Sequence, residues 1–479
     1  MPVKYQHLIE GQWRGVGESP NINPSDTDDV VGEAPSASRD EVLEAIAAAR
    51  GASDAWAYST PQQRFDVLDR AGTEVLARAS ELGEVLAREE GKPIAEARGE
   101  AMRSGQLFKF FAGEALRLTG DLTPSVRPGL TVEVTREPVG VVGIVTPWNF
   151  PLAIPTWKIA PALAWGNTVV FKPASNTPGC AFELAMILER SGLPAGVLNL
   201  VYASGSVAGS ALIESGLVDA ISFTGSTGIG KPLAVAAVQQ GIRVQTEMGG
   251  KNPMVVLDDA DLALAIEVCT SGAYFSTGQR CTATSRIIVT KGIHDHFVEL
   301  LETRMRSLQV GPALDPETVI GPVVDQSQLD TDRRYLEIAA AEGGDVVGGD
   351  VVARATPGFY LTPALVKGTT NQMTINREEV FGPVASVIEV DDYEEALATA
   401  NDTAFGLSAG ICTTSLSRAA HFKRHSRAGM VMVNAPTAGV DYHVPFGGVK
   451  GSSYGAREQG TYAKEFYSVV KTSYVNAQA

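Results

Sequence analysis

The sequence predicts an α/β protein with a doubly wound parallel sheet, a second α/β domain and a β-strand extension. The first observation is a run of apolar strands that alternate with Ala- and Leu-rich helical segments over residues 141–250. Strands that are apolar throughout and separated by helices are typical of a parallel sheet covered on both faces. A second strand and helix series follows over residues 252–448. A chain of 479 residues is also too long for one core of average size, so we expect two or three domains.

The elements before the first sheet are a short hairpin at the start and a helical region. Residues 38–118 carry the spacing of apolar side chains that is typical of helices. The segment TVEVTREPVG at 131–140 then alternates apolar and polar residues, which predicts a strand with one face in water. We expect this strand to extend away from the core.

Five parallel strands are expected in the first sheet. Such sheets bind ligands at the carboxyl ends of their strands, so the residues that follow each strand are candidates for a binding site. The predicted strands cover residues 141–148, 167–174, 196–203, 219–225 and 243–250.

The second series contains strands at residues 285–292, 383–390 and 429–436, and the tail at 461–478 alternates again. An alternating strand at each end of the core favours pairing with a neighbouring subunit. We therefore expect a homodimer or homotetramer.

Composition excludes several classes of function. A formal net charge of -16 and a pI near 4.9 disfavour binding to nucleic acid. No apolar run reaches the roughly 18 residues of a membrane span, and four cysteines without CxxC pairing indicate free thiols in a reducing compartment. We expect a soluble cytoplasmic protein without a membrane partner.

No metal site is expected. His421 and His425 in HFKRH stand four residues apart and could share one helix face. No third ligand accompanies them, so a solvated basic helix face is the favoured interpretation.

Cys281 is the cysteine with the strongest case for chemistry. In FSTGQRCTATSR a helical segment ends near Gly278 and a strand begins near Ser285, which predicts that the thiol lies on a connecting turn. The neighbouring Arg280 could stabilise a thiolate, the reactive form. The other cysteines are predicted to be buried core residues: Cys180, Cys269 and Cys412.

Glu247 lies at the end of a predicted strand, before two glycines. From the residues alone it is either the ribose-binding acid of a dinucleotide fold or a solvated residue at a strand end. The turn with Gly225, Gly228 and Gly230 follows a strand and opens a helix, the context of a phosphate-binding turn. Its spacing is GxxGxG, not GxGxxG, so the motif is weak and depends on the surrounding strands.

Six motifs together resemble the aldehyde dehydrogenase superfamily. They are TPWNFP at 146–151, FKPAS at 171–175, EMGGK around Glu247, FSTGQRCT around Cys281, EEVFGPV at 378–384 and PFGG at 445–448. The resemblance implies the aldehyde dehydrogenase fold: a Rossmann-like dinucleotide-binding domain (1–118 and 139–249), a catalytic domain (250–448) and an oligomerisation extension (119–138 and 449–479).

The resemblance also implies a role for each matching residue. Cys281 would be the nucleophile, Glu247 the base that activates the hydrolytic water, and Asn149 an oxyanion donor, so Glu247 would not bind ribose. Lys158 and Glu458 match positions proposed for a proton relay. The implied cofactor-binding residues are Thr146, Pro147, Trp148, Lys172, Ser175, Gly205, Gly209, Phe223, Gly225, Ser226, Glu379 and Phe381.

Ser175 and Arg280 bear on cofactor and substrate. NAD-preferring relatives tend to carry Glu where Ser175 stands, and serine tolerates a 2′-phosphate, so NADP is the expected cofactor, with NAD also used. Arg280 either binds a substrate carboxylate or holds the cysteine turn through backbone hydrogen bonds. Phe150, Trp157 and Phe446 match apolar positions of the substrate tunnel.

Within the superfamily the chain most resembles enzymes that oxidise α-ketoglutaric semialdehyde (2,5-dioxopentanoate). Succinic semialdehyde and a broad range of aldehydes remain alternatives. A CoA-acylating enzyme would not need Glu247, and a non-phosphorylating glyceraldehyde-3-phosphate dehydrogenase would need further cations, for which Arg117 is a weak candidate. A catalytically silent binding or structural protein of the same fold is the alternative from another class.

Overall fold

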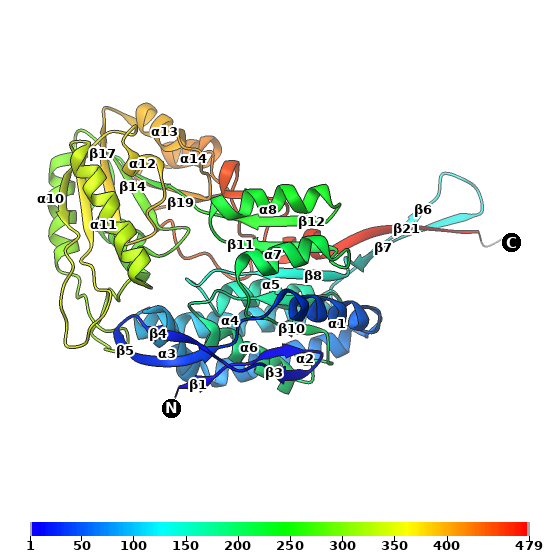
Figure 1. Cartoon of the computed structure of the whole chain (residues 1–479). Coiled ribbons are helices and arrows are strands. Elements are labelled where there is room, and N and C mark those ends of the chain that lie inside the picture. Colours follow the sequence, from blue (N-terminus) through cyan, green and yellow to red (C-terminus); the bar gives the residue numbers. More distant parts are fainter. Residues whose placement is uncertain (1, 477–479) are drawn as a thin grey trace.

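The computed structural model describes residues 2–476, so the ends of the predicted first domain and extension (residues 1 and 477–479) lie outside the described residues. Two mixed α/β bodies lie side by side, and a long ribbon stands away from them (Figure 1). The predicted helical region forms α1 (Arg39–Ala57), α2 (Pro61–Ala77), α3 (Ala79–Glu90) and α4 (Ile94–Ala115). Ser38 and Thr60 begin α1 and α2 with capping boxes, which satisfy backbone N–H groups that the first turn leaves free.

The first sheet has eight strands in the order β20-β12-β11-β8-β9-β10-β2-β3. Its five central strands are parallel, as predicted, and the opening hairpin β2–β3 continues it in antiparallel fashion. The strands are β2 (His7–Ile9), β3 (Gln12–Arg14), β8 (Val141–Val145), β9 (Thr168–Lys172), β10 (Leu198–Leu200), β11 (Ala220–Thr224), β12 (Arg243–Glu247) and β20 (Ser453–Tyr454). The helices between them are α5 (Ala153–Ala164), α6 (Pro178–Arg190), α7 (Gly205–Glu214) and α8 (Thr227–Gln239).

A small separate sheet near the N-terminus has the order β1-β5-β4. It consists of β1 (Val3–Lys4), β4 (Ser19–Asn23) and β5 (Asp26–Ala34).

The second body holds a seven-stranded sheet in the order β15-β16-β17-β14-β13-β18-β19, parallel except for β15. Its strands are β13 (Asn252–Val256), β14 (Thr284–Thr290), β15 (Asp345–Gly348), β16 (Ala364–Thr369), β17 (Val384–Val390), β18 (Ser408–Cys412) and β19 (Met430–Val433). Its helices are α9 (Leu262–Tyr274), η1 (Phe275–Gly278), α10 (His294–Arg306), α11 (Gln326–Ala341), α12 (Thr374–Arg377), α13 (Tyr393–Asn401) and α14 (Leu416–His425).

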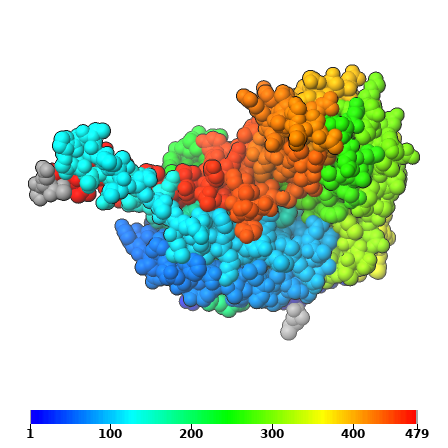
Figure 2. All heavy atoms as spheres, turned by 180° about the vertical axis from the view of Figure 1, so that it is seen from behind, coloured from blue at the N-terminus to red at the C-terminus, as the bar shows by residue number. Residues whose placement is uncertain are grey.

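The ribbon is a three-stranded sheet of β6 (Asp121–Pro124), β7 (Leu130–Pro138) and β21 (Ser468–Asn476). β21 pairs with β7 over its whole length, from Ser468 opposite Pro138 to Asn476 opposite Leu130. Figure 2 shows the ribbon standing clear of the body.

The start of the predicted extension needs correction. Residues 449–467 belong with the body: β20 pairs with β12, and Phe466 and Tyr467 are buried in the core of the first domain. Among the described residues of this segment, β21 alone joins the ribbon, because Phe466 and Tyr467 supply apolar surface that the core covers. This segment also contains η2 (Lys450–Ser452), η3 (Thr461–Ala463) and α15 (Lys464–Tyr467).

The ends of the strands in one large sheet face the ends of the strands in the other. β12 ends at Glu247, and the next strand along the chain, β13, already belongs to the second sheet. Cys281 lies three residues before β14, so the carboxyl edge of the first sheet faces an amino edge of the second. Residues from both sheets therefore contribute to the space between them.

Candidate active site

The first sheet reverses its strand order between β8 and β11, since β9 and β10 lie on one side of β8 and β11 and β12 on the other. Ligands of doubly wound sheets bind outside the carboxyl ends of the strands at such a point. A cavity of about 310 Å³ lies there and is lined by residues after both strands, among them Trp148, Asn149, Gly225 and Ser226. We call it the cofactor-side cavity.

Cys281 lines this cavity and also a second cavity of about 150 Å³, which we call the substrate-side cavity. Ile154 is the other residue in the lining of both. The thiol is partly exposed, whereas Cys180, Cys269 and Cys412 are buried, as predicted. Cys281 is thus the cysteine that ligands from either side can reach.

The turn before Cys281 has an unusual backbone. Ser276 and Thr277 have φ values of 53° and 55°, the left-handed region that non-glycine residues rarely adopt. The carboxylate of Glu96 on α4 holds this turn by accepting hydrogen bonds from the backbone N–H and hydroxyl of Ser276. On the other side of the thiol, Asn252 donates to the carbonyl of Cys281 at 2.8 Å. Contacts on both sides therefore fix the position of the nucleophile.

Asn149 is joined to the same turn. The side-chain NH2 of Asn149 donates to the backbone carbonyl of Gln279 at 3.0 Å. The backbone carbonyl of Asn149 accepts from the ammonium group of Lys92 at 2.6 Å. A side-chain amide has two N–H groups, so one remains for an oxyanion. The structure thus brings the predicted oxyanion donor next to the cysteine turn.

Glu247 is buried at the end of β12. Burial, reinforced by the charge of Glu458, raises the pKa of Glu247 well above its usual range, although a hydrogen bond from Ser453 opposes the shift. Its other oxygen has no hydrogen-bond partner among the described residues. A carboxylate with a raised pKa is suited to accept a proton near neutral pH.

The pKa of the Cys281 thiol is raised to about 12. Burial is the largest cause, followed by the negative charges of Glu379 and Glu247; the backbone N–H groups of Cys281 and Thr282 act in the opposite direction. This is opposite to the expectation that Arg280 stabilises a thiolate. The guanidinium of Arg280 instead donates to the carbonyls of Ser271 and Gly272 in α9.

Lys158 and Glu458 form a buried ion pair behind Glu247. Lys158 also donates to the hydroxyl of Ser222 at 2.7 Å, and the indole of Trp157 donates to Glu458 at 2.6 Å. Because Glu458 raises the pKa of Glu247, the two carboxyl groups interact electrostatically. The pair predicted as a relay therefore lies beside the predicted base.

Ten of the twelve predicted cofactor residues follow or end elements of the first domain, whereas Glu379 and Phe381 come from the second body, in the segment before β17. Six line the cofactor-side cavity: Pro147, Trp148, Gly225, Ser226, Glu379 and Phe381. The remaining six follow or end neighbouring elements at the carboxyl edge of the first sheet: Thr146 after β8, Lys172 and Ser175 at the end of β9, Gly205 and Gly209 in the first turns of α7, and Phe223 near the end of β11.

Two features of this edge fit a dinucleotide. Ser226 precedes α8 without a side-chain hydrogen bond to the helix, so the first turn of α8 keeps free N–H groups. A Cβ at Gly225 would lie 2.6 Å from the Phe223 ring, so any other residue here would have to displace that ring. Trp148 and Phe381, which both line the cofactor-side cavity, pack edge to face with their ring centres 5.5 Å apart. The φ of Phe381 is 67°, in the left-handed region that non-glycine residues rarely adopt.

All four predicted substrate residues line the substrate-side cavity: Phe150, Trp157, Arg280 and Phe446. Seven others were not predicted from the sequence: Glu96, Arg103, Ile154, Ser276, Thr282, Gly439 and Val440. Ser276 and Thr282 stand close to Cys281 in the chain, and this adjacency could have identified them. Glu96 and Arg103 lie on α4, where only tertiary packing places them by the nucleophile. Gln328 and Thr331, which line the cofactor-side cavity, were missed for the same reason.

Several other predicted features lie outside the site. His421 and His425 stack on α14 at 4.1 Å, and His421 pairs with the Tyr393 hydroxyl. Arg117 lies just after α4, paired with Glu114 and largely exposed.

No helix within residues 2–476 is long and apolar enough to cross a membrane.

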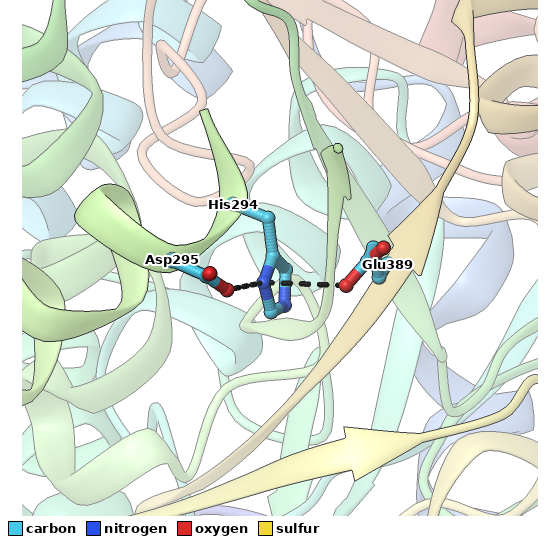
Figure 3. A group of neighbouring side chains, drawn as sticks. All are labelled: His294, Asp295 and Glu389. Atoms are coloured by element: carbon cyan, nitrogen blue, oxygen red, sulfur yellow. Dashed lines mark hydrogen bonds and ion pairs between the residues drawn. The ribbon is translucent and has the colours of Figure 1, made fainter. Parts of the chain in front are cut away.

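Figure 3 shows the one grouping among the described residues with ligand atoms close enough for a metal. His294 Nδ1 lies 2.9 Å from Asp295 and 3.5 Å from Glu389. The Asp295 side chain is fully exposed in the first turn of α10, where an acid is favoured by the helix dipole. The grouping is a surface cluster apart from both cavities.

A sequence profile of the aldehyde dehydrogenase family matches residues 13–473. The chain belongs to the aldehyde dehydrogenase family. It is therefore an NAD(P)-dependent aldehyde dehydrogenase family enzyme, and the resemblance found in its motifs is confirmed.

Two relatives match this aldehyde dehydrogenase over nearly its whole length. An alpha-ketoglutaric semialdehyde dehydrogenase of Bacillus subtilis is 43% identical over 477 residues, covering 98% of each chain. An alpha-ketoglutarate semialdehyde dehydrogenase of Haloferax volcanii is 42% identical over 476 residues, again covering 98% of each.

Solved structures confirm the predicted fold class. An NAD-dependent aldehyde dehydrogenase from Sinorhizobium meliloti is 36% identical, with a TM-score of 0.96 over 99% of this chain and 95% of the other. An NADP dependent enzyme of E. coli is 35% identical, with a TM-score of 0.95 over 99% and 98%. Both cofactors thus occur among similar enzymes.

Proposed function

We propose that this enzyme oxidises α-ketoglutaric semialdehyde to the corresponding acid through a thioester on Cys281. The observation that carries the proposal is the position of Cys281 in the linings of both cavities. A thiol at that junction can contact an aldehyde on one side and a nicotinamide on the other. A catalytically silent member of the fold would not need this arrangement together with a buried, high-pKa carboxyl at Glu247.

The chain's residues suit each step. After losing its proton to solvent, Cys281 attacks the aldehyde carbon as the thiolate. The free N–H of the Asn149 amide and the backbone N–H of Cys281 stabilise the alkoxide, each donor typically contributing ~3 kcal/mol. A bound nicotinamide cofactor supplies the acceptor for the hydride. Glu247 then accepts a proton from the water that hydrolyses the thioester, and Lys158 with Glu458 provides the route by which that proton leaves.

NADP is proposed as the preferred cofactor, with NAD also used. Ser175 is exposed at the end of β9 and carries no negative charge, while Lys172, three residues earlier, has no carboxylate within ion-pairing distance among the described residues. A 2′-phosphate would meet a cation and a hydroxyl here. Glu379 and Lys172 are proposed to bind the two riboses.

The choice of substrate rests on the two relatives and on the two cations in the substrate-side cavity, Arg103 and Arg280. The rest of the lining is mostly apolar, and its one carboxylate, Glu96, accepts two hydrogen bonds from Ser276. From the sequence, Arg280 either binds a substrate carboxylate or holds the cysteine turn through backbone hydrogen bonds. Since its guanidinium already donates to two carbonyls, holding the cysteine turn is the role that its contacts support.

The three units of the chain are proposed to follow the sheets: the first body binds cofactor, the second carries the nucleophile, and the ribbon assembles subunits. Apolar side chains are exposed on α8 and β21: Ile229, Val235, Val238, Val470 and Tyr474. Covering them in a homodimer or homotetramer would remove this apolar surface from water.

Initial rates of reduced-cofactor formation, measured without CoA, test the proposal. The substrates are 2,5-dioxopentanoate, succinic semialdehyde and pentanal, each with NADP and with NAD. We expect kcat/KM to be highest for 2,5-dioxopentanoate with NADP. A higher value for succinic semialdehyde would reassign the substrate, and a higher value for pentanal would contradict a carboxylated substrate altogether.

A further inference from the structure

Arg103 supplies a second guanidinium to the substrate-side cavity. It lies on α4, seven residues after Glu96, so both side chains emerge from the same face of the helix and both line the cavity with Cys281. Residues Gly439 and Val440 line the same cavity, and the next residue, Asp441, is near enough to influence Arg103 electrostatically. Arg103 therefore stands where α4 meets the loop around residue 440.

The hydrogen bonds of Arg103 leave its charge without a counterion. Its Nη2 donates to the side-chain carbonyl of Gln459 at 3.1 Å, and its Nε is buried without a partner among the described residues. No carboxylate within residues 2–476 lies within ion-pairing distance of it. Burial lowers the pKa of Arg103, against the influence of Glu100 and Asp441. Arg103 is partly buried, and a desolvated N–H donor without a partner is costly unless an acceptor joins it.

Glu100 and Glu96, the two acids near Arg103 on α4, are already engaged, whereas Asp441 is exposed and lies beyond ion-pairing distance of Arg103. Glu100 accepts from Lys92 and from the backbone of α5, and Glu96 accepts twice from Ser276. The donors of Arg103 are therefore free to meet a ligand.

Arg280 also has a buried Nε without a hydrogen-bond partner among the described residues, but the contacts of its terminal nitrogens differ from those of Arg103. One terminal nitrogen of Arg280 already donates to two main-chain carbonyls, which ties the guanidinium to α9 on the side of the cysteine turn. Arg103 comes from another wall of the cavity. An aldehyde acid carries its two functional groups at opposite ends, so the residue that binds the carboxylate should stand apart from the residue that attacks the aldehyde.

We propose that Arg103, held by Gln459, binds the carboxylate of the aldehyde substrate while Cys281 attacks its other end. The inference rests on the proposed oxidation of a carboxylated aldehyde. It assigns the selectivity for a carboxylated substrate to Arg103 and not to Arg280, the neighbour of the nucleophile. The planar guanidinium suits a carboxylate because its N–H groups pair with both oxygens.

The test compares Arg103→Met with Arg280→Met and with Arg98→Met. Arg98 is the matched control: it lies on the same helix, exposed and paired with Glu84. We expect Arg103→Met to lower kcat/KM for 2,5-dioxopentanoate by about 30-fold or more, mainly through KM, with a loss for pentanal at least about tenfold smaller. Arg103→Lys should recover part of the loss because it keeps the charge, and Arg98→Met should behave as the wild type.

A binding measurement separates this inference from the choice of substrate. Glutarate should protect Cys281 of the wild-type enzyme from iodoacetamide, and Arg103→Met should weaken that protection by a similar factor. If the wild type prefers pentanal, the proposed substrate is wrong, and the protection experiment alone decides the role of Arg103. If Arg103→Met misfolds, as judged by thermal unfolding, Arg103→Gln replaces it.

Three results would overturn the role of Arg103. These are protection by glutarate that is unchanged in Arg103→Met, no protection of the wild type, and loss of selectivity in Arg280→Met instead of Arg103→Met.

Discussion

Lys92 and Glu100 form a buried ion pair with an N–O distance of 2.6 Å directly behind Asn149. Burial alone would lower the pKa of Lys92, but Glu100 and Glu90 outweigh it and the pKa is raised. The ammonium group also donates to the Asn149 carbonyl and lies 3.9 Å from the centre of the Phe150 ring. On its other oxygen, Glu100 accepts from the backbone N–H groups at 152 and 153, where α5 begins.

This pair therefore positions the segment that carries the oxyanion donor, and Lys92→Met should affect stability and rate separately. Removing one partner leaves a buried charge, which typically costs about 3–5 kcal/mol of unfolding free energy. Adding Glu100→Gln should recover part of the stability, whereas kcat should stay about 100-fold low because Asn149 has lost its anchor. Thermal unfolding and initial rates measure the two effects. A double variant with wild-type kcat would show that the pair is only structural.

Cys281 should react slowly with iodoacetamide near neutral pH. Because burial, Glu379 and Glu247 raise the pKa of the thiol to about 12, the thiolate fraction should grow about tenfold per pH unit without a plateau below pH 10. Glu379→Gln removes a negative charge beside the thiol, lowers its pKa and should speed alkylation at pH 7.5. Cys281→Ser is the control, since the other cysteines are buried. A plateau below pH 9 would mean that a cation such as Arg280 stabilises the thiolate after all.

Glu247→Gln should separate the two halves of the reaction. Its loss removes the base for thioester hydrolysis, so steady-state turnover should fall by about 100- to 10,000-fold. Hydride transfer precedes hydrolysis, so mixing enzyme, cofactor and aldehyde should still release about one reduced cofactor per active site. Stopped-flow absorbance measures this burst, with the exposed Glu214→Gln as the matched control. A variant that loses the burst together with turnover would assign Glu247 to an earlier step.

Ser175→Glu should reverse the cofactor preference. A carboxylate at this exposed position would repel the 2′-phosphate of NADP and accept hydrogen bonds from the ribose hydroxyls of NAD. We expect kcat/KM for NADP to fall by about 10- to 100-fold and the value for NAD to rise or stay constant. Ser80→Glu, exposed at the start of α3, adds the same charge far from the cofactor-side cavity and serves as the control. Equal losses with both cofactors would contradict the assignment of Ser175.

Local pattern predicts much of this fold. Helical spacing over 38–118, apolar strands between 141 and 250 and alternation at 131–140 depend on neighbours a few residues apart, and the elements appear where these patterns indicate. The position of Cys281 on a turn between a helical segment and a strand is predicted for the same reason. The identities of the reacting residues could be proposed because each stands in a short motif.

Contacts between distant segments had to come from the structure. Alternation in the tail does not tell which strand it joins. The sequence therefore predicts that residues 449–467 belong to the extension, whereas in the structure β20 pairs with β12 in the first sheet. Adjacency of Arg280 to Cys281 left two roles open, and the carbonyls of Ser271 and Gly272 favour one of them.

The sequence by itself therefore determined the elements, their alternation and the chemistry of the motifs, because these depend on short-range periodicity and on residue type. Tertiary structure alone decided that α4 turns Arg103 and Glu96 toward a cysteine in the other domain, and that Lys92 lies behind Asn149. The physical reason is that helical spacing defines the faces of a helix but not their partners. Those partners are selected by packing across the boundary between the two sheets, over which no local pattern extends.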